Sequence, residues 1–202
     1  MDDDSYLNGI REGLKESVDF FACQDKFIRE SWVVANFLTN MSISFSETDL
    51  VRGSDPPDVV FCEAQFEVKE ILDKDRKRHI EYKKALARAN LATDPAQLHE
   101  RFSPKDISIK EVFALVYSVA ENFATQKYPC EVRKNLDLLC YVNLQDVMRL
   151  IETPLPDVTP LAALGYRSVS FLEGHMSCVL CADSNAPSFL HVKPGIIHRA
   201  VP

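Results

Sequence analysis

Apolar residues recur every three or four positions in the first part of the chain, which is the spacing of amphipathic helices. The first stripe lies within residues 4–22 and consists of Leu7, Ile10, Leu14, Val18 and Phe21. A second helix is predicted over residues 24–40. Further along, Ser108 and Glu111 have the spacing of a capping box, which predicts that another helix with an apolar stripe begins there.

Shorter apolar runs bounded by turn residues predict strands. Residues 41–51 lead into the first strand, and residues 59–62 form a buried second strand. A tight connection at residues 63–65 returns the chain into a strand over residues 66–71, which makes a hairpin. Three more apolar runs predict a central strand and a C-terminal hairpin, at residues 136–144, 167–172 and 176–182.

Length and composition are those of an ordinary globular protein. The chain has 202 residues, of which 46% are hydrophobic and 26% charged. We predict a single domain over residues 1–202, of mixed α/β (α+β) class. Its expected parts are an N-terminal helical part, a core region and a C-terminal hairpin with a tail, at residues 1–40, 41–150 and 151–202.

The sequence predicts neither export nor membrane insertion. Residues 1–4 lack the basic and apolar regions of a secretory signal. No apolar run approaches the roughly 20 residues that span a bilayer. We therefore expect a cytoplasmic protein with no membrane partner.

The six cysteines are scattered along the chain, and in the cytoplasm we expect them to be reduced. Cys178 and Cys181 have the spacing of half a zinc site. A step of three along a strand, however, points two side chains to opposite faces of the sheet. A structural zinc site needs four convergent ligands, so zinc is disfavoured here.

The hairpin carries the candidate chemistry. Asp58 immediately precedes the buried strand, and Glu67 and Lys69 lie on the returning strand. Because side chains alternate along a strand, Glu67 and Lys69 share one face, opposite Val68. Two carboxylates and one ammonium group can therefore converge at one place. The alternative is an ordinary surface hairpin that ends in charged residues.

These residue types suit a divalent metal. Asp58 and Glu67 offer the hard oxygen ligands that Mg²⁺ or Mn²⁺ prefers, and the Val68 carbonyl offers a third. Such a metal polarises a phosphodiester oxygen and lowers the pKa of a bound water. Lys69 would orient that water or stabilise charge on the phosphorus, and it also limits repulsion between the two acids.

Glu30 is a further candidate for this site. It lies in an apolar stripe of the second predicted helix, between Phe27 and Val34. Burying an acid in such a stripe is costly unless it has a partner, and a metal site would supply one. Alternatively, Glu30 lies at the rim and pairs with a neighbouring basic residue, Arg29 or Lys26. Two other acids, Glu47 and Asp49, compete for the same role on the first core strand.

A basic segment follows the hairpin. Residues 73–89 hold seven basic residues against three acids, although the whole chain has a net charge of −7. The segment contains no Gly or Pro and favours a helix. Its candidate contacts with a nucleic-acid backbone are Arg76, Arg78, His79, Tyr82 and Lys83. A solvated helix with a charged face is the alternative.

Asp58, followed by Glu67-Val68-Lys69, resembles the core motif of the PD-(D/E)XK nuclease superfamily. More narrowly, residues 55–84 are similar to a small family of uncharacterised bacterial proteins that carry an endonuclease label. The superfamily resemblance implies a three-layer, restriction-endonuclease-like αβββαβ core, here with added helices. It also implies that Asp58 and Glu67 are metal ligands and that Lys69 is catalytic. Some members keep the fold without catalysis, so the fold does not decide the function.

The sequence thus predicts an Mg²⁺- or Mn²⁺-dependent nuclease that hydrolyses phosphodiester bonds, with Asp58, Glu67, Lys69 and Glu30 as the catalytic group. DNA is the expected nucleic-acid partner, and a homodimer would suit cleavage of both strands of a duplex. The alternative is a catalytically silent module that kept the fold and binds nucleic acid or another protein.

Overall fold

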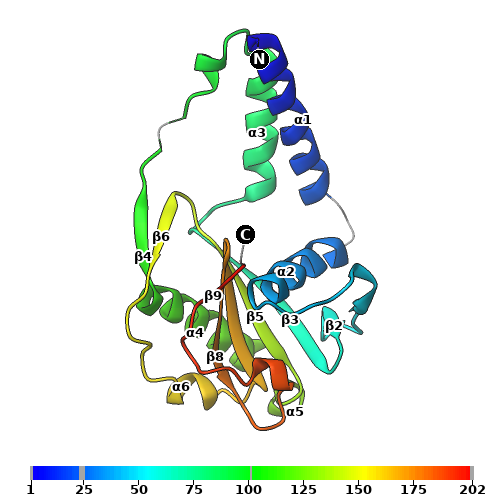
Figure 1. Cartoon of the computed structure of the whole chain (residues 1–202), viewed down its shortest axis with the longest axis vertical. Coiled ribbons are helices and arrows are strands. Elements are labelled where there is room, and N and C mark those ends of the chain that lie inside the picture. Colours follow the sequence, from blue (N-terminus) through cyan, green and yellow to red (C-terminus); the bar gives the residue numbers. More distant parts are fainter. Residues whose placement is uncertain (1, 23–25, 101, 201–202) are drawn as a thin grey trace. The chain divides into compact units, whose positions relative to one another are not determined.

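The computed structural model describes residues 2–22, 26–100 and 102–200 and contains a seven-stranded mixed sheet (Figure 1). Its strands lie in the order β1-β2-β3-β5-β7-β8-β9. Their bounds are Leu50–Arg52 (β1), Val59–Phe61 (β2), Ala64–Leu72 (β3), Asp137–Asn143 (β5), Ser168–Glu173 (β7), Met176–Ala182 (β8) and His198–Arg199 (β9).

The direction of pairing changes twice across this sheet. Strands β1, β2 and β3 pair antiparallel, β3, β5 and β7 pair parallel, and β8 and β9 follow antiparallel. Parallel neighbours need a crossover connection, whereas antiparallel neighbours can be joined by a turn. The two predicted hairpins are therefore confirmed as β2–β3 and β7–β8, and they flank the central parallel strands.

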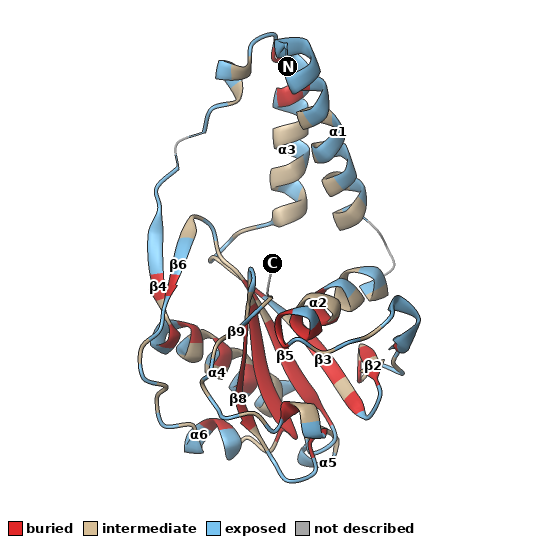
Figure 2. Cartoon of the chain, viewed as in Figure 1, coloured by how far each residue is buried: buried red, intermediate tan, exposed pale blue. Residues whose placement is uncertain are grey.

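Helices cover both faces of the sheet. On one face, helix α2 (Lys26–Asn40) places Phe37 against Phe66 of β3, with 5.9 Å between the ring centres. On the other face, helix α4 (Ile109–Gln126) buries Val116 in one cluster with Leu138 and Cys140 of β5. Figure 2 shows β5 and β8 almost entirely buried between these layers. The mixed α/β fold class predicted from the sequence is confirmed.

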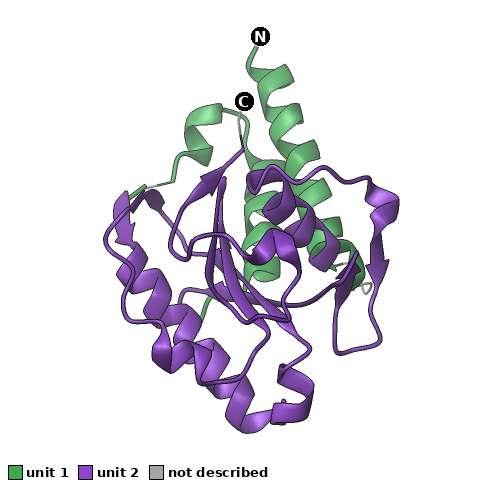
Figure 3. Ribbon diagram, turned by 60° about the horizontal axis from the view of Figure 1, so that its bottom comes forward, with its two compact units in different colours: residues 1–29, 74–103 green, residues 30–73, 104–202 purple. Residues whose placement is uncertain are grey.

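The chain forms two compact units (Figure 3). Unit 1 comprises Met1–Arg29 and Lys74–Ser103, and unit 2 comprises Glu30–Asp73 and Pro104–Pro202. Unit 1 contains helix α1 (Asp3–Ala22), helix α3 (Arg78–Leu91) and the 3-10 helix η2 (Pro95–Leu98). In unit 2 lie the seven-stranded sheet and the remaining elements, which are η1 (Glu47–Asp49), β4 (Lys105–Ser108), α5 (Cys130–Arg133), β6 (Val147–Ile151), α6 (Thr159–Ala162) and η3 (Ser188–Leu190).

The basic helix α3 is not part of the core of unit 2. The core of unit 2 has the order α2, β1, β2, β3, α4, β5, which is the expected αβββαβ order, but α3 and β4 are inserted between β3 and α4. The crossover helix is α4, because Val112, Val116 and Ala120 give it a fully buried stripe. Helix α3 buries only Ala89 and belongs to unit 1.

Three strands, β4, β6 and the two-residue β9, lie where the sequence predicted none. Strand β4 pairs in parallel with β6 in a separate two-stranded sheet. Both strands are short, and in β6 only Leu150 is buried, so neither gives the sustained alternation that identifies a strand.

Among the helices of the described residues, none is long and apolar enough to cross a membrane.

The two cysteines of β8 were predicted to lie on opposite faces of the sheet, but they lie on the same face. Cys178 and Cys181 both belong to the hydrophobic cluster under α4. The pairing register of β7 with β8 shifts between Val169 and Ser170, and such a bulge interrupts the regular alternation of side chains.

A buried ion pair fixes the beginnings of three strands. Asp137 at the start of β5 is fully buried and pairs with Arg167. Its carboxylate also accepts hydrogen bonds from the Ser168 hydroxyl at 2.8 Å and from the Gln65 amide at 2.8 Å. Arg167 additionally donates to the Glu63 carbonyl at 3.0 Å. One carboxylate thus sets the register of β3, β5 and β7 at one end of the sheet.

We expect Arg167→Met to destabilise the protein by about 3 kcal/mol, because it leaves the Asp137 carboxylate buried without its partner. Urea unfolding would measure this change. The control is Arg199→Met, which removes the pair with Glu152 at the surface and should cost less than about 1 kcal/mol. Equal losses in both variants would contradict the role given to Asp137.

Candidate metal centre

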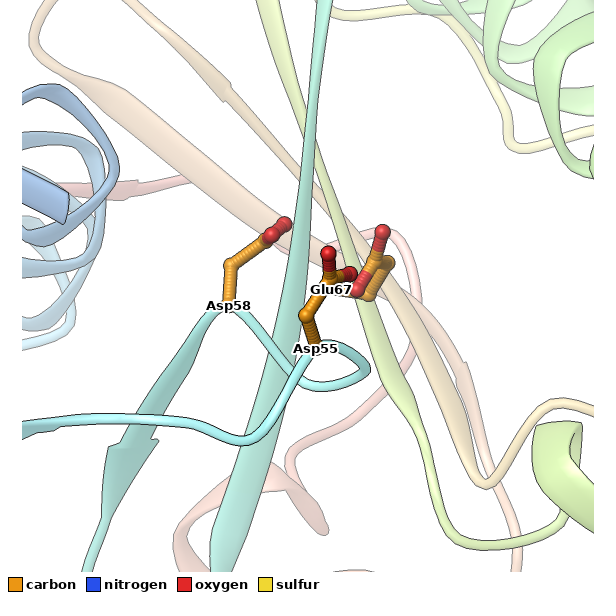
Figure 4. Close-up of side chains that lie close together, drawn as sticks. All are labelled: Asp55, Asp58 and Glu67. Atoms are coloured by element: carbon orange, nitrogen blue, oxygen red, sulfur yellow. The ribbon is translucent and has the colours of Figure 1, made fainter. Parts of the chain in front are cut away.

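A short loop before β2 presents two acids. Within it, the Gly53 amide donates to the Asp58 carbonyl at 3.0 Å, and the Asp55 amide donates to the Pro57 carbonyl at 3.1 Å. A Cβ atom on Gly53 would lie 1.9 Å from the Pro57 carbonyl oxygen, so only glycine fits there. These contacts hold the turn closed, and Figure 4 shows the Asp55 and Asp58 side chains beside β3.

Asp58 is tied directly to β3. Its amide donates to the Phe66 carbonyl at 3.0 Å, and its carboxylate accepts from the Val68 amide at 2.9 Å. In an extended strand the amide and the carbonyl of one residue point to the same side. The Val68 carbonyl therefore faces the edge of β3 where Asp58 lies, as a third metal ligand requires.

Glu67 precedes Val68 on β3 and is completely buried. Its Oε1 atom accepts a hydrogen bond from the Tyr128 hydroxyl and pairs with the Lys69 ammonium group. The Lys127 ammonium group lies 3.9 Å from the same oxygen. The second oxygen, Oε2, is buried without a hydrogen-bond partner. A buried carboxylate oxygen without a partner is costly, so this atom is available to a ligand.

The three carboxylates of Asp55, Asp58 and Glu67 converge. Each contributes one oxygen to a group in which all three atoms lie within 4.8 Å of one another (Figure 4). All three donors are hard oxygens, which is the chemistry of Mg²⁺, Ca²⁺ and Mn²⁺ sites. The donor set and the unpartnered Glu67 oxygen both fit a divalent cation.

Lys69 links the two predicted metal ligands. Its ammonium group pairs with Glu67 and lies 3.7 Å from Asp58 and 5.1 Å from the centre of the Phe123 ring. Burial lowers the pKa of Lys69, but the hydrogen bond to Glu67 and the charges of Glu67, Asp58 and Glu30 outweigh it and raise this pKa overall. Lys69 is therefore a cation at neutral pH.

Burial is the main cause of a raised pKa at Asp58, and the charges of Glu67 and Asp55 add to it. Lys69 and the Val68 amide oppose this rise without cancelling it. A carboxyl group whose pKa is higher in the folded than in the unfolded state costs stability once it ionises. A cation bound between the acids would relieve this cost.

Tyr128 is nearly buried, and its hydroxyl stays protonated. Burial raises its pKa far above the ordinary value, and the hydrogen bond to Glu67 and the nearby acids raise it further. Tyr128 is therefore a permanent donor to Glu67 at neutral pH.

The structure brings together Asp58, Glu67, Lys69 and the Val68 backbone as predicted, and their roles remain predictions. Glu30 lies close enough for its charge to act on Lys69, but it is not one of the described acids in the converging group. Glu47 and Asp49 lie on η1 before β1 and are also not members of that group.

The sequence did not single out Asp55, Tyr128 or Lys127. Asp55 is exposed and has a positive φ of 47°. The direction of its side chain depends on how the loop closes. Tyr128 and Lys127 follow α4, and Tyr128 is 61 residues from Glu67 in the sequence. No local sequence pattern predicts a contact between residues that far apart.

The five predicted nucleic-acid contacts lie in unit 1, and several are engaged within it. Tyr82 stacks on Phe21 with 5.1 Å between ring centres, and the Arg78 guanidinium lies 3.6 Å from the centre of the Phe21 ring. Arg76 pairs with Glu81 at 3.0 Å. The remaining two are His79, whose Nδ1 is buried without a partner, and the exposed Lys83.

The chain resembles proteins of unknown function. The sequence model of a family described as "Putative endonuclease, protein of unknown function (DUF1780)" matches residues 2–200. A solved structure from Pseudomonas aeruginosa strain PAO1 is similar, with a TM-score of 0.68 and 27% sequence identity over 98% of this chain and 96% of the other. That protein is described as one of unknown function in the monooxygenase superfamily. Among curated proteins, none matches this chain.

We expect Gly53→Ala to open the loop, because the new methyl group would clash with the Pro57 carbonyl. The protein should lose about 1–3 kcal/mol of stability, as overpacked variants do, and its affinity for Mn²⁺ should fall. Thermal unfolding and calorimetric titration with Mn²⁺ would measure these changes.

Gly13→Ala in α1 is the matched control. A Cβ atom there meets nothing within 4 Å, and alanine favours a helix, so stability should be kept or rise by up to about 1 kcal/mol with Mn²⁺ affinity unchanged. Native-like Mn²⁺ binding by Gly53→Ala would show that the loop contributes nothing to the site.

Proposed function

This chain belongs to the family described as "Putative endonuclease, protein of unknown function (DUF1780)". We propose that it is a metal-dependent nuclease that hydrolyses phosphodiester bonds in nucleic acid, with DNA as its substrate. The observation that carries the proposal is the buried Glu67 carboxylate, whose Oε2 has no partner beside two further acids. Family membership supports the nuclease class, and the donor set supports the metal.

Mg²⁺ or Mn²⁺ suits this site better than a transition metal bound through nitrogen. The converging group consists of carboxylates, and the Val68 carbonyl adds another oxygen. Non-haem iron oxygenases hold their metal with two histidines and one carboxylate, whereas all-oxygen sites take Mg²⁺, Ca²⁺ or Mn²⁺. The donor chemistry therefore suits a hydrolytic Mg²⁺ or Mn²⁺ site and does not match a site of two histidines and one carboxylate.

Asp58, Glu67 and Asp55 would hold the cation through one oxygen each. A bound Mg²⁺ or Mn²⁺ would polarise the scissile phosphate and lower the pKa of a coordinated water. Lys69, a cation held between two acids, stabilises the negative charge that develops on the phosphoryl oxygens. Since Lys69 is fixed by ion pairs and by the Phe123 ring, it needs little reorganisation during the reaction.

A second cation beside the site can bind the substrate backbone. The Lys127 side chain is 49% exposed, and its ammonium group lies 4.6 Å from the centre of the Tyr128 ring. A lysine held beside the acids can contact a phosphate near the scissile bond, and such contacts supply affinity without sequence preference. Lys127 belongs to unit 2, as do the acids, so this contact does not depend on the basic helix α3.

A catalytically silent binding module is the competing proposal. It predicts nucleic-acid binding that depends on basic residues and survives the loss of Asp58. The nuclease predicts that metal binding and cleavage are lost together.

We expect Asp58→Asn to weaken Mg²⁺ and Mn²⁺ binding by more than about 100-fold, since it neutralises a direct ligand and even outer partners contribute about 10–100-fold. Cleavage of plasmid DNA should fall in parallel. Asparagine keeps an oxygen that can accept from the Val68 amide, so the thermal unfolding midpoint without metal should not fall.

The control is Asp106→Asn, which neutralises an exposed acid of unit 2 on β4. It should bind metal and cleave DNA as the native chain does. If Asp58→Asn bound no metal but retained DNA binding, and the native chain cleaved no substrate, the binding module would be the better account.

Lys127→Met should weaken binding of a DNA duplex and reduce the slope of log affinity against log salt by about one phosphate contact. Methionine keeps an unbranched apolar side chain of similar length over the Tyr128 ring. Fluorescence anisotropy over a salt series, in Ca²⁺ to limit cleavage, would measure the slope. Lys110→Met changes an exposed lysine at the start of α4, the helix that Lys127 follows, and should leave the slope unchanged.

A further inference from the structure

Tyr128 is the one hydroxyl group described in contact with the Glu67 carboxylate, and no motif of the sequence assigns it a role. We propose that Tyr128 is a positioning residue, whose hydroxyl holds Oε1 of Glu67 so that Oε2 is presented to the metal ion. This assignment rests on the proposed function, because it needs a metal at the three acids.

The two oxygens of Glu67 have opposite surroundings. Oε1 receives the Tyr128 hydroxyl and the Lys69 ammonium group, and Lys127 lies 3.9 Å away. Oε2 has no partner, although it is buried. Donors on one oxygen alone fix the rotation of a carboxylate, so the free oxygen is the one directed to a ligand.

Tyr128 is itself held from several sides. Its amide donates to the Phe123 carbonyl at 2.8 Å, and its carbonyl accepts from the Arg133 guanidinium. Its ring stacks on Phe123 with 5.8 Å between centres. The hydroxyl therefore reaches Glu67 from a fixed position, and little conformational freedom is lost when the metal binds.

Lys69 cannot replace this function. Its ammonium group is shared between Glu67 and Asp58, so it does not hold the Glu67 carboxylate alone. The tyrosine hydroxyl is a directional donor to Glu67 alone among the described acids. In metal sites such outer donors orient the ligand and contribute about 10–100-fold to metal affinity.

The test is Tyr128→Phe, which removes only the hydroxyl and keeps the ring on Phe123. Titration calorimetry of the full chain with Mg²⁺ and with Mn²⁺ should show a dissociation constant raised by about 10–100-fold. The matched control is Tyr166→Phe, since Tyr166 is also a buried tyrosine of unit 2, but its hydroxyl donates to the Ala120 carbonyl at 3.3 Å. It should bind both metals as the native chain does.

A double variant separates positioning from general loosening of the core. If Tyr128 acts through Glu67, adding Tyr128→Phe to Glu67→Gln should weaken metal binding no further than Glu67→Gln does alone. Additive losses would overturn the assignment. Thermal unfolding without metal, run on each variant, identifies any loss of binding that merely follows loss of folding.

The outcomes distinguish the two proposals. If the native chain binds Mg²⁺ or Mn²⁺ and Tyr128→Phe binds equally well, the positioning role is wrong while the proposed function stands. If the native chain binds neither metal at millimolar concentration, both fail together. A selective loss in Tyr128→Phe, with Tyr166→Phe unchanged, supports both.

Discussion

A carboxylate can lie inside a protein core only when cations and donors replace the water it has lost, and Glu67 is where this constraint acts. Its position on β3 is fully buried, and it brings Lys69, Tyr128 and Lys127 to the same place. One of its oxygens is still left without a partner. What distinguishes this oxygen is its place beside Asp55 and Asp58, where a bound cation would supply the missing partner.

The sheet topology explains why a site can form there. Strand β2 pairs with β3 only from Ala64 to Phe66, whereas β3 continues to Leu72 beside β5. Past Phe66 the outer edge of β3 carries backbone groups that β2 does not reach, and the Asp58 side chain takes the Val68 amide instead. The loop closed by Gly53 then adds a second acid. An incomplete antiparallel ladder beside a complete parallel one thus leaves room for ligands from both backbone and side chains.

Local patterns predicted the elements well and their assembly less well. Alternation along the hairpin identified Glu67 and Lys69 as neighbours on one face, and the structure brings Asp58 to them. A helix within residues 73–89 was also predicted. Its composition could not show that it has too few apolar positions to join the core, in which α4 is the crossover helix. Tyr128 could not be predicted, because its role depends on where α4 ends relative to β3. Contacts between distant segments decide the site, and periodicity does not encode them.

The ligand atoms of the site favour a hard cation over a metal that is bound through nitrogen. A non-haem iron site of the facial-triad type uses two histidines and one carboxylate, whereas hydrolysis of a phosphodiester needs a hard cation and a fixed positive charge. The converging donors are three carboxylates, and the fixed charge is Lys69, which two of those acids hold. Two of the predicted nucleic-acid contacts on α3, Arg78 and Tyr82, pack on Phe21 within unit 1. The acids of the site and the two lysines beside them, Lys69 and Lys127, all belong to unit 2, so unit 2 alone carries the groups that a nuclease needs.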